Sequence, residues 1–346
     1  MSPSSPTLAA ASAESVNPSA SRTLKYSEAL NEALREELRR DPSVFLIGEG
    51  IAGRGGIWKV TENLVQEFGP KRVIETPIVE ASFTGTAVGA AIAGMRPVVE
   101  IAFIDFSLLA MDSIVNQAAK YHLMTGGLGR VPLVIRTQGG SGTGVAAQHS
   151  QSLEALFYHI PGLKVVMPST PRDAKGLLKS AIRDNGPVIF IEHKVLYTTT
   201  GDVPADDYVI PLGEADVKRS GGDVTLIAWS NMVPRTLAAA EKLAAAGIAA
   251  EVIDPRTLVP LDKNRLLDSV RKTQHVVIVQ EAVRRGGVAS DIASIIQEEA
   301  FDYLDAPIQI VAGKTTPIPF GRKLEVACIP QEDDIVRAAR RALHLE

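Results

Sequence analysis

From Ser27 onward the sequence alternates between helical and strand-like periodicity. Short apolar runs typical of buried strands lie at 44–49, 72–75, 97–103, 131–137, 163–167 and 187–192. Helical patterns separate most of these runs, at 27–41, from 80 onward, and at 108–120, 151–158 and 171–184. This alternation is typical of parallel sheets whose two faces are covered by helices. The sequence therefore predicts a protein of the α/β class.

The chain is expected to form two doubly wound domains with mainly parallel sheets. A second alternating unit runs from residue 220 to 346, after a segment at 197–219 that contains Pro204 and Pro211 and lacks clear periodicity. We interpret 197–219 as a linker and 23–196 as the first domain. Residues 1–22 are rich in Ser, Ala and Pro and hold almost no large apolar side chains, so we expect a disordered tail there.

Charge and composition exclude several classes of protein. A formal net charge of −4 over 346 residues is too mild for a nucleic-acid-binding or anionic-membrane-binding surface. A single cysteine, Cys328, excludes an internal disulfide and a cysteine metal cluster, and the six histidines lack the spacing of a zinc site. No apolar run reaches the roughly 18 residues that a transmembrane helix needs. The tail resembles neither a secretory signal nor a mitochondrial presequence, so we expect a cytoplasmic protein.

The segment 72–101 places a lone carboxylate, Glu80, at the start of a helix built almost wholly of small residues. A carboxyl group held in an apolar crevice can exchange a proton near neutral pH. The alternative interpretation is an acidic residue that complements the helix dipole in the first turn. Gly85 and Gly89 stand four residues apart on one helix face, where they permit tight packing, often across a subunit interface.

The glycine-rich segment 137–151 follows a strand and precedes a helix, the usual place for an active-site loop in a doubly wound sheet. It lacks the sequence patterns of a phosphate-binding P-loop, a dinucleotide-binding turn and a serine-hydrolase elbow. His149 in this loop is a candidate general acid or base, and the alternative is a histidine that caps the next helix. Phe103 and Phe106 follow another strand, where an aromatic ring either stacks on a flat heterocycle or packs in the core.

Six motifs, in this order, resemble those of one protein family. They are GEGIAG, RVIETPIVEASFTGTAVGAAIAGMRPVVEI, DFSLLAMDSIVNQAAK, GVAAQHSQSLEA, PGLKVVMPSTPRDAKGLLKSAIRDNGPVIFIEH and VPLDKNRLLDSVRKT. The family is that of the β subunits of the thiamine-diphosphate-dependent first component of 2-oxo acid dehydrogenase complexes, and the resemblance covers residues 23–345. It implies a transketolase-like pyrimidine-binding domain followed by a transketolase C-terminal domain that makes subunit and acyltransferase contacts.

The resemblance implies a role for each matching residue. Glu80 matches the glutamate that hydrogen-bonds the aminopyrimidine ring of thiamine diphosphate and helps to generate its reactive carbanion. Phe106 matches the aromatic residue that stacks on the pyrimidine. His149 matches the histidine that serves proton transfer during reductive acylation of the lipoyl group. Four further positions match residues that hold a structural potassium ion: Leu133, Ala181, Ile182 and Asp184.

The chain lacks the Gly-Asp-Gly motif with which enzymes of this cofactor class hold magnesium and the diphosphate. The resemblance therefore implies an α subunit that supplies this half of the site, in an assembly of two α and two β chains, with a lipoyl acyltransferase core as a further partner. The expected reaction is oxidative decarboxylation of a small 2-oxo acid with acyl transfer to lipoyl-lysine. Pyruvate is the leading substrate, followed by acetoin and branched-chain oxo acids. A non-catalytic assembly subunit and a self-sufficient transketolase-like enzyme are interpretations from other classes.

Overall fold

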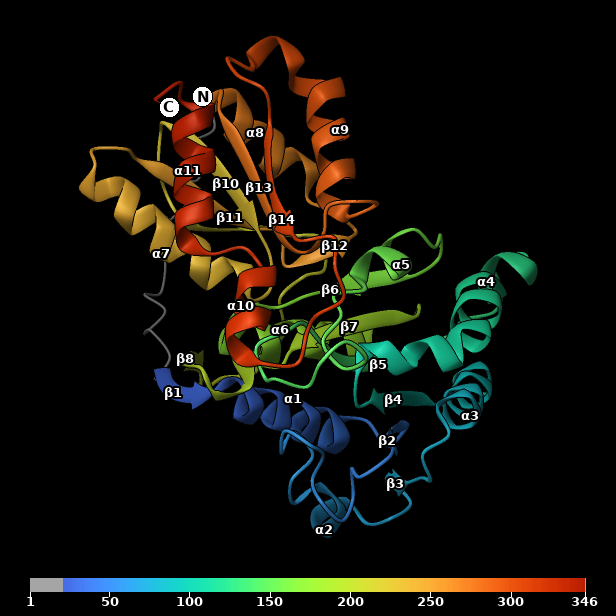
Figure 1. Ribbon diagram of the computed structural model, residues 1–346. Coiled ribbons are helices and arrows are strands. Elements are labelled where there is room, and N and C mark those ends of the chain that lie inside the picture. Colours follow the sequence, from blue (N-terminus) through green and yellow to red (C-terminus); the bar gives the residue numbers. More distant parts are fainter. Residues whose placement is uncertain (1–20, 346) are drawn as a thin grey trace, which may run out of the picture.

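The computed structural model describes residues 21–345, which form two α/β domains, each built around one sheet (Figure 1). In Figure 1 the first domain, coloured blue to green, lies below the second domain, coloured yellow to red. Both sheets are mainly parallel and carry helices, so the predicted fold class is confirmed.

The first sheet has seven strands in the order β12-β6-β7-β5-β4-β2-β3. All neighbouring strands are parallel except β12 and β6. The strands are β2 (Val44–Gly48), β3 (Val73–Glu75), β4 (Arg96–Ile101), β5 (Val134–Gly139), β6 (Lys164–Val166), β7 (Val188–His193) and β12 (Thr257–Val259). β2 is buried along its whole length, which explains why its sequence is a continuous apolar run.

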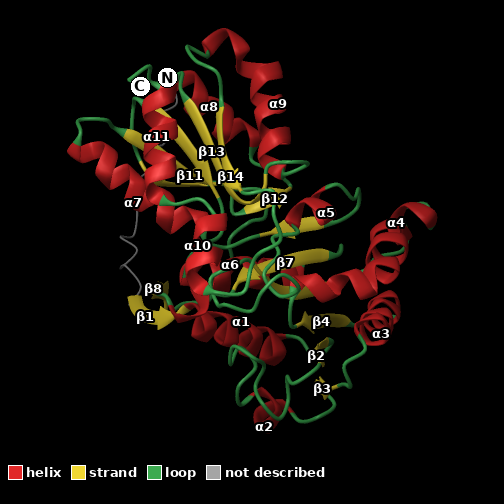
Figure 2. Cartoon of the chain, viewed as in Figure 1, coloured by secondary structure: helices red, strands yellow, loops and turns green. Residues whose placement is uncertain are grey.

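Helices cover the two faces of this sheet (Figure 2). They are α1 (Tyr26–Arg40), α2 (Leu64–Phe68), α3 (Glu80–Ile92), α4 (Ala119–Met124), α5 (Glu154–Tyr158) and α6 (Pro171–Arg183). The single helix predicted at 108–120 is wrong in detail. A 3₁₀ helix, η1 (Ile104–Ala110), and a π-helix, η2 (Asp112–Ala118), precede α4. The hydroxyl of Ser107 donates to the Ile104 carbonyl at 2.5 Å, which tightens the first turn of η1.

Two strands lie inside the segment predicted to be a linker. β8 (Thr200–Pro204) pairs antiparallel with β1 (Ser21–Lys25), and β9 (Asp216–Arg219) joins the second sheet. Ser21 and Arg22 therefore belong to a strand and not to a disordered tail, whereas the rest of the predicted tail lies outside the described residues. Pairing of such short edge strands rests on main-chain hydrogen bonds, which require no apolar alternation in the sequence.

The second sheet has five strands in the order β14-β13-β10-β11-β9. Its remaining strands are β10 (Val224–Ala228), β11 (Ala250–Asp254), β13 (Val276–Val283) and β14 (Gln309–Gly313). The helices of this domain are α7 (Met232–Ala245), α8 (Lys263–Thr273), α9 (Val288–Ala300), η4 (Phe301–Tyr303), α10 (Arg322–Cys328) and α11 (Glu332–Ala342). A short 3₁₀ turn, η3 (Leu196–Thr198), follows β7 in the first domain.

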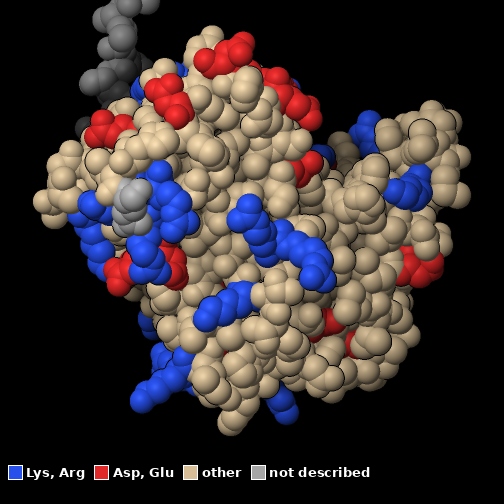
Figure 3. Space-filling model, turned by 45° about the horizontal axis from the view of Figure 1, so that its top comes forward, with Lys and Arg blue, Asp and Glu red and all other residues tan. Residues whose placement is uncertain are grey.

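On the face shown in Figure 3, basic side chains cross the middle and acidic side chains lie mainly near the rim, with broad uncharged areas between them. No helix among the described residues is long and apolar enough to cross a membrane.

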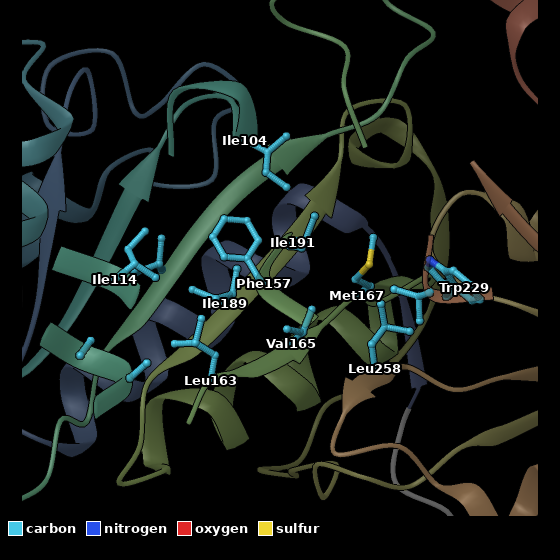
Figure 4. Packing of buried hydrophobic residues seen from close by; sticks show 14 of the residues in the cluster. Ile104, Ile114, Phe157, Leu163, Val165, Met167, Ile189, Ile191, Trp229 and Leu258 are labelled. Atoms are coloured by element: carbon cyan, nitrogen blue, oxygen red, sulfur yellow. The ribbon is translucent and has the colours of Figure 1, made fainter. Parts of the chain in front are cut away.

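One hydrophobic cluster continues from the first domain into the second (Figure 4). Phe157 and Ile189 lie within the first domain, and Trp229 and Leu258, from segments further along the chain, lie beside Met167. Since β12 also extends the first sheet, the two domains share packed core. Side chains of the second domain can therefore fix loops of the first.

Candidate active site

The candidate residues follow strands at one edge of the first sheet. β3 leads to Glu80, β4 leads to Phe103 and Phe106, and β5 leads to the loop that carries His149. β5, β4, β2 and β3 are parallel neighbours in this order, so the loops that follow them open on the same side. The carboxyl edge of a parallel sheet is where ligands bind in open α/β folds.

Phe103, Phe106 and His149 form a cluster of three rings. The ring centroids are 6.0 Å apart for the two phenylalanines, 4.7 Å for Phe103 and His149, and 5.1 Å for Phe106 and His149. All three contacts are edge-to-face, and each ring keeps some exposed surface. His149 does not cap the next helix, because the N-cap position of α5 is Leu153. The structure thus brings two of the predicted site residues, Phe106 and His149, into contact.

Glu80 is the first residue of α3, as the sequence predicted, and only 9% of its surface is exposed. Among residues 21–345, none forms a hydrogen bond or ion pair with its carboxylate. α3 packs against η1, which holds Phe106, but Glu80 itself makes no ring contact with Phe106 or His149. The residues around Glu80 are apolar and open to solvent: Ile78 is 72% exposed and Val79 is 46% exposed.

Lys194, which directly follows β7, completes the cluster. Its ammonium donates to the main-chain carbonyl oxygen of His149 and lies over the Phe103 ring, 5.5 Å from the centroid. Burial lowers the pKa of Lys194 to about 8, although the charges of Asp105, Glu281 and Glu325 act in the opposite direction. A lysine with this pKa changes its charge just above neutral pH.

The glycine-rich loop is bound by two carboxylates of the second domain. Glu281 on β13 accepts a hydrogen bond from the main-chain N–H of Ser141 at 2.7 Å. Glu325 on α10 accepts hydrogen bonds from the main-chain N–H groups of Gly142 at 2.6 Å and Gly144 at 2.9 Å. Successive N–H groups of this kind form an anion-binding concavity, and here the chain fills it with its own carboxylates.

Glu281 also binds His193, with 2.9 Å between the carboxylate oxygen and Nε2. Burial opposes ionisation of Glu281, but His193, the Ser141 N–H and Asn231 outweigh it and lower the pKa of Glu281 to about 2. The carboxylate is therefore ionised throughout the neutral range. Beside this contact, a cavity of about 340 Å³ opens between the loop and the second domain, lined by residues that include Gln151 and Cys328.

Two cationic side chains lie against oxygens that the sequence predicted to hold potassium. Nη1 of Arg96 donates to the carbonyl oxygens of Ile182 at 2.9 Å and Asp184 at 2.8 Å. Nζ of Lys164 lies 2.6 Å from both carboxylate oxygens of Asp184. The carbonyl oxygens of the other two predicted ligands accept main-chain hydrogen bonds: Leu133 and Ala181. A potassium ion could bind these oxygens only if Lys164 or Arg96 broke its hydrogen bond to at least one of them.

The sequence did not indicate Lys194, Glu281 or Glu325. Lys194 could have been found from its position, because it directly follows β7. β7 is the neighbour of β5, the strand that leads to His149. The two glutamates carry no local signal, because each contacts a loop more than 130 residues earlier in the chain, with separations of 140 residues for Glu281 and 183 for Glu325.

Comparison with known proteins places these residues in a family context. Residues 22–200 match the transketolase pyrimidine-binding domain, and residues 213–335 match the transketolase C-terminal domain. The chain is 49% identical to the pyruvate dehydrogenase E1 component subunit beta of Rickettsia felis, over 92% of this chain and 97% of the relative. It is 48% identical to the acetoin:2,6-dichlorophenolindophenol oxidoreductase subunit beta of Bacillus subtilis, over 91% of this chain and 96% of the relative.

A solved structure titled split-gene transketolase, inactive beta4 tetramer, has a TM-score of 0.77 against this chain. The two are 26% identical in sequence, and the match covers 92% of this chain and 98% of the other. The two-domain arrangement is thus shared along nearly the whole length.

Proposed function

Because this chain belongs to the transketolase-like β subunits of the thiamine-diphosphate-dependent 2-oxo acid dehydrogenases, we propose that it acts with an α subunit in the oxidative decarboxylation of pyruvate. The acyl group formed in this reaction passes to lipoyl-lysine. The relatives from Rickettsia felis and Bacillus subtilis differ by one percentage point in identity, so acetoin is the alternative substrate. Acetoin has no carboxyl group, so its carbon–carbon bond would be cleaved with release of acetaldehyde in place of carbon dioxide.

The observation that carries the proposal is the Glu80 carboxylate. It is 9% exposed and has no hydrogen-bond partner among the described residues. The carboxylate oxygens are not fully enclosed by the described residues, so a ligand that brings its own donor can reach them. Phe106 lies on η1, which packs against α3, and His149 lies on the loop after β5. Their two rings offer a surface for a flat heterocycle. Together these residues fit the pyrimidine half of thiamine diphosphate.

Thiamine diphosphate, when bound, supplies the electron sink for decarboxylation. Glu80 would hold the pyrimidine ring nitrogen through a carboxyl oxygen, the atom at which it would exchange a proton. Phe106 would orient the flat ring by packing against it. His149 moves a proton at its imidazole nitrogen during acyl transfer to the lipoyl group, and the Lys194 contact to its carbonyl oxygen fixes its main chain.

The second half of the site comes from an α subunit that holds magnesium and the diphosphate, because the chain has no Gly-Asp-Gly motif. The exposed surface near Glu80 supports this partner. Ile78 is 72% exposed and Leu109 is 62% exposed. Apart from the neighbouring backbone of α3, no described atom lies within 4 Å of the place a Cβ on Gly89 would take. An exposed apolar surface that another chain can approach closely, beside a cofactor site that needs a second subunit, is suited to a subunit interface.

The second domain is proposed to contact a lipoyl acyltransferase core. This part of the proposal rests on the family alone. A potassium ion at Leu133, Ala181, Ile182 and Asp184 stays a prediction, and it requires that the ion compete with Lys164 for the Asp184 carboxylate.

The proposal is tested with the chain co-expressed with its α subunit. Pyruvate, acetoin and branched-chain oxo acids are compared as substrates, with dichlorophenolindophenol as electron acceptor. Glu80→Gln should lower the rate by roughly 10²–10⁴-fold, because the amide cannot exchange the proton. Glu62→Gln is the matched control, since Glu62 is exposed and pairs only with exposed Lys59. Full activity of Glu80→Gln would remove Glu80 from the mechanism.

A further inference from the structure

The short helix α10 has an inverted pattern of burial. Glu325 is fully buried, whereas Leu324 is 60% exposed and Val326 is 39% exposed. Acidic side chains are rarely buried unless they are paired, and apolar neighbours normally take the inward position. In α10 it is therefore the carboxylate of Glu325 that points inward. Figure 1 shows α10 beside the green loops of the first domain.

The inward carboxylate binds the loop that carries His149. Its two oxygens accept the N–H groups of Gly142 and Gly144, at 2.6 Å and 2.9 Å. Charge-assisted hydrogen bonds of this kind are about twice as strong as neutral ones. The two glycines have φ values of 106° and 73°, a left-handed conformation that the paired N–H groups require.

The start of the loop is tightly packed, and His149 is held at its far end. A Cβ on Gly142 would lie 2.6 Å from Val195, and a Cβ on Gly140 would lie 1.9 Å from Nε2 of His193. His193 is itself bound to Glu281. At the far end, Lys194 binds the carbonyl oxygen of His149. Only the segment between Gly144 and His149 lies between these two anchors.

We propose that Glu325 is a positioning residue through which the second domain sets the place of the His149 side chain for acyl transfer. This inference rests on the proposed function. It gives the second domain a part in the reaction through the loop, in addition to any part in assembly. Glu281 supports the same loop from the neighbouring strand, through the N–H of Ser141.

The test is a double-mutant cycle in the complex with the α subunit, using Glu325→Gln and His149→Ala. Glutamine keeps one acceptor oxygen but turns an amide donor toward a glycine N–H. Two rates are measured: reduction of dichlorophenolindophenol, which reports decarboxylation, and acylation of free lipoamide, which reports the step assigned to His149. Glu298→Gln is the control, because Glu298 is exposed in the same domain and bonds only to Ser294.

Glu325→Gln should lower lipoamide acylation by roughly 10- to 100-fold, as expected for a misplaced catalytic group. The dye rate should change by less than about threefold, and Glu325→Gln should add less than about twofold when His149 is already alanine. Glu325→Asp keeps the charge and should restore part of the acylation rate. If Glu325→Gln does not assemble, the same cycle is run with Glu325→Asp.

The inference would be overturned if Glu325→Gln lowered the dye rate and the lipoamide rate equally. It would also be overturned if Glu325→Gln lowered lipoamide acylation by the same factor with and without His149→Ala. Failure of the proposed function has a different signature. In that case the unaltered complex would decarboxylate none of the oxo acids, and no cycle could be measured from it. An active complex that is insensitive to Glu325 would therefore refute the positioning role alone.

Discussion

The ammonium group of Lys194 donates a hydrogen bond to the carbonyl oxygen of His149 and lies 5.5 Å from the centre of the Phe103 ring. Since Phe103 also contacts the His149 ring at 4.7 Å, one buried cation touches both the main chain and the ring packing of the candidate catalytic histidine. The lysine lies on β7's carboxyl end and the histidine on the loop after β5, and these strands are neighbours.

Lys194→Met should lower lipoamide acylation by roughly tenfold, because methionine fills a similar volume but leaves the His149 carbonyl without its donor. Decarboxylation with the dye should change less. Lys120→Met serves as the control, since Lys120 donates only to the Pro161 carbonyl on another part of the surface. A Lys194→Met enzyme with unaltered acylation would contradict the role of this contact.

Lys194 also makes stability depend on pH in a defined direction. Its pKa is 10.5 in the ordinary state and about 8 when folded, so between pH 8 and 10.5 the unfolded chain binds more protons. The free energy of unfolding contributed by this group therefore rises with pH in that window, by up to about 3 kcal/mol. Urea unfolding of the unaltered chain and of Lys194→Met at pH 7.5 and pH 10 measures the difference. The prediction fails if the gap between the two proteins is the same at both values.

Glu281 should act in the opposite range of pH. Folding lowers its pKa from 4.5 to about 2, so its contribution is fully present above pH 4.5 and is lost as pH falls toward 2. Glu281→Gln should therefore cost about 3 kcal/mol of unfolding free energy at pH 7 and progressively less below pH 4.5. Denaturant unfolding at pH 7, 4.5 and 3 gives the comparison. A constant cost at all three values would mean that the charge of Glu281 is not what stabilises the contact.

A buried ion-pair network beneath the loop should dominate the stability of the first sheet. Nε and Nη2 of Arg136 bind the two carboxylate oxygens of Glu192 at 2.7 and 2.8 Å, and Nη1 binds Glu100 at 2.6 Å. Arg136→Met leaves two carboxylates buried without a cation and should cost about 3–5 kcal/mol. Denaturant unfolding measures this cost, and replacing Glu192 by Gln in the same protein should recover part of it. A cost below about 1 kcal/mol would place the network in the class of weak surface pairs.

Local patterns in the sequence predicted much of the fold. The apolar run at 44–49 and the small-residue segment that starts at Glu80 correspond to β2 and α3, because burial on both faces and close helix packing leave their mark on neighbouring residues. The η1 and η2 turns could not be read in this way. Both pack against α3, a contact that local sequence patterns do not show.

The site was predictable to the extent that its residues follow strands. Phe106 and His149 both do, and the structure places them in contact. Glu281 and Glu325 act from the second domain, on a loop whose sequence says only that its N–H groups are accessible. The partner of an anion-binding loop is set by the tertiary structure, so the composition of the loop alone cannot distinguish a phosphate from a carboxylate of the same chain.

The potassium prediction can be decided by removing its competitor. Lys164 is 34% exposed and Asp184 is 23% exposed, and the ammonium lies 2.6 Å from the carboxylate. Lys164→Met leaves the carboxylate with the Gly186 N–H as its remaining donor and no cation, so a potassium ion that uses Asp184 should bind this variant more tightly. The melting temperature of Lys164→Met should then rise when KCl replaces NaCl at constant ionic strength, and rise more than that of the unaltered chain. Lys120→Met, which removes a lysine that does not contact Asp184, should behave as the unaltered chain does. If neither protein distinguishes the two salts, Lys164 and Arg96 occupy the oxygens of Ile182 and Asp184 without a metal ion.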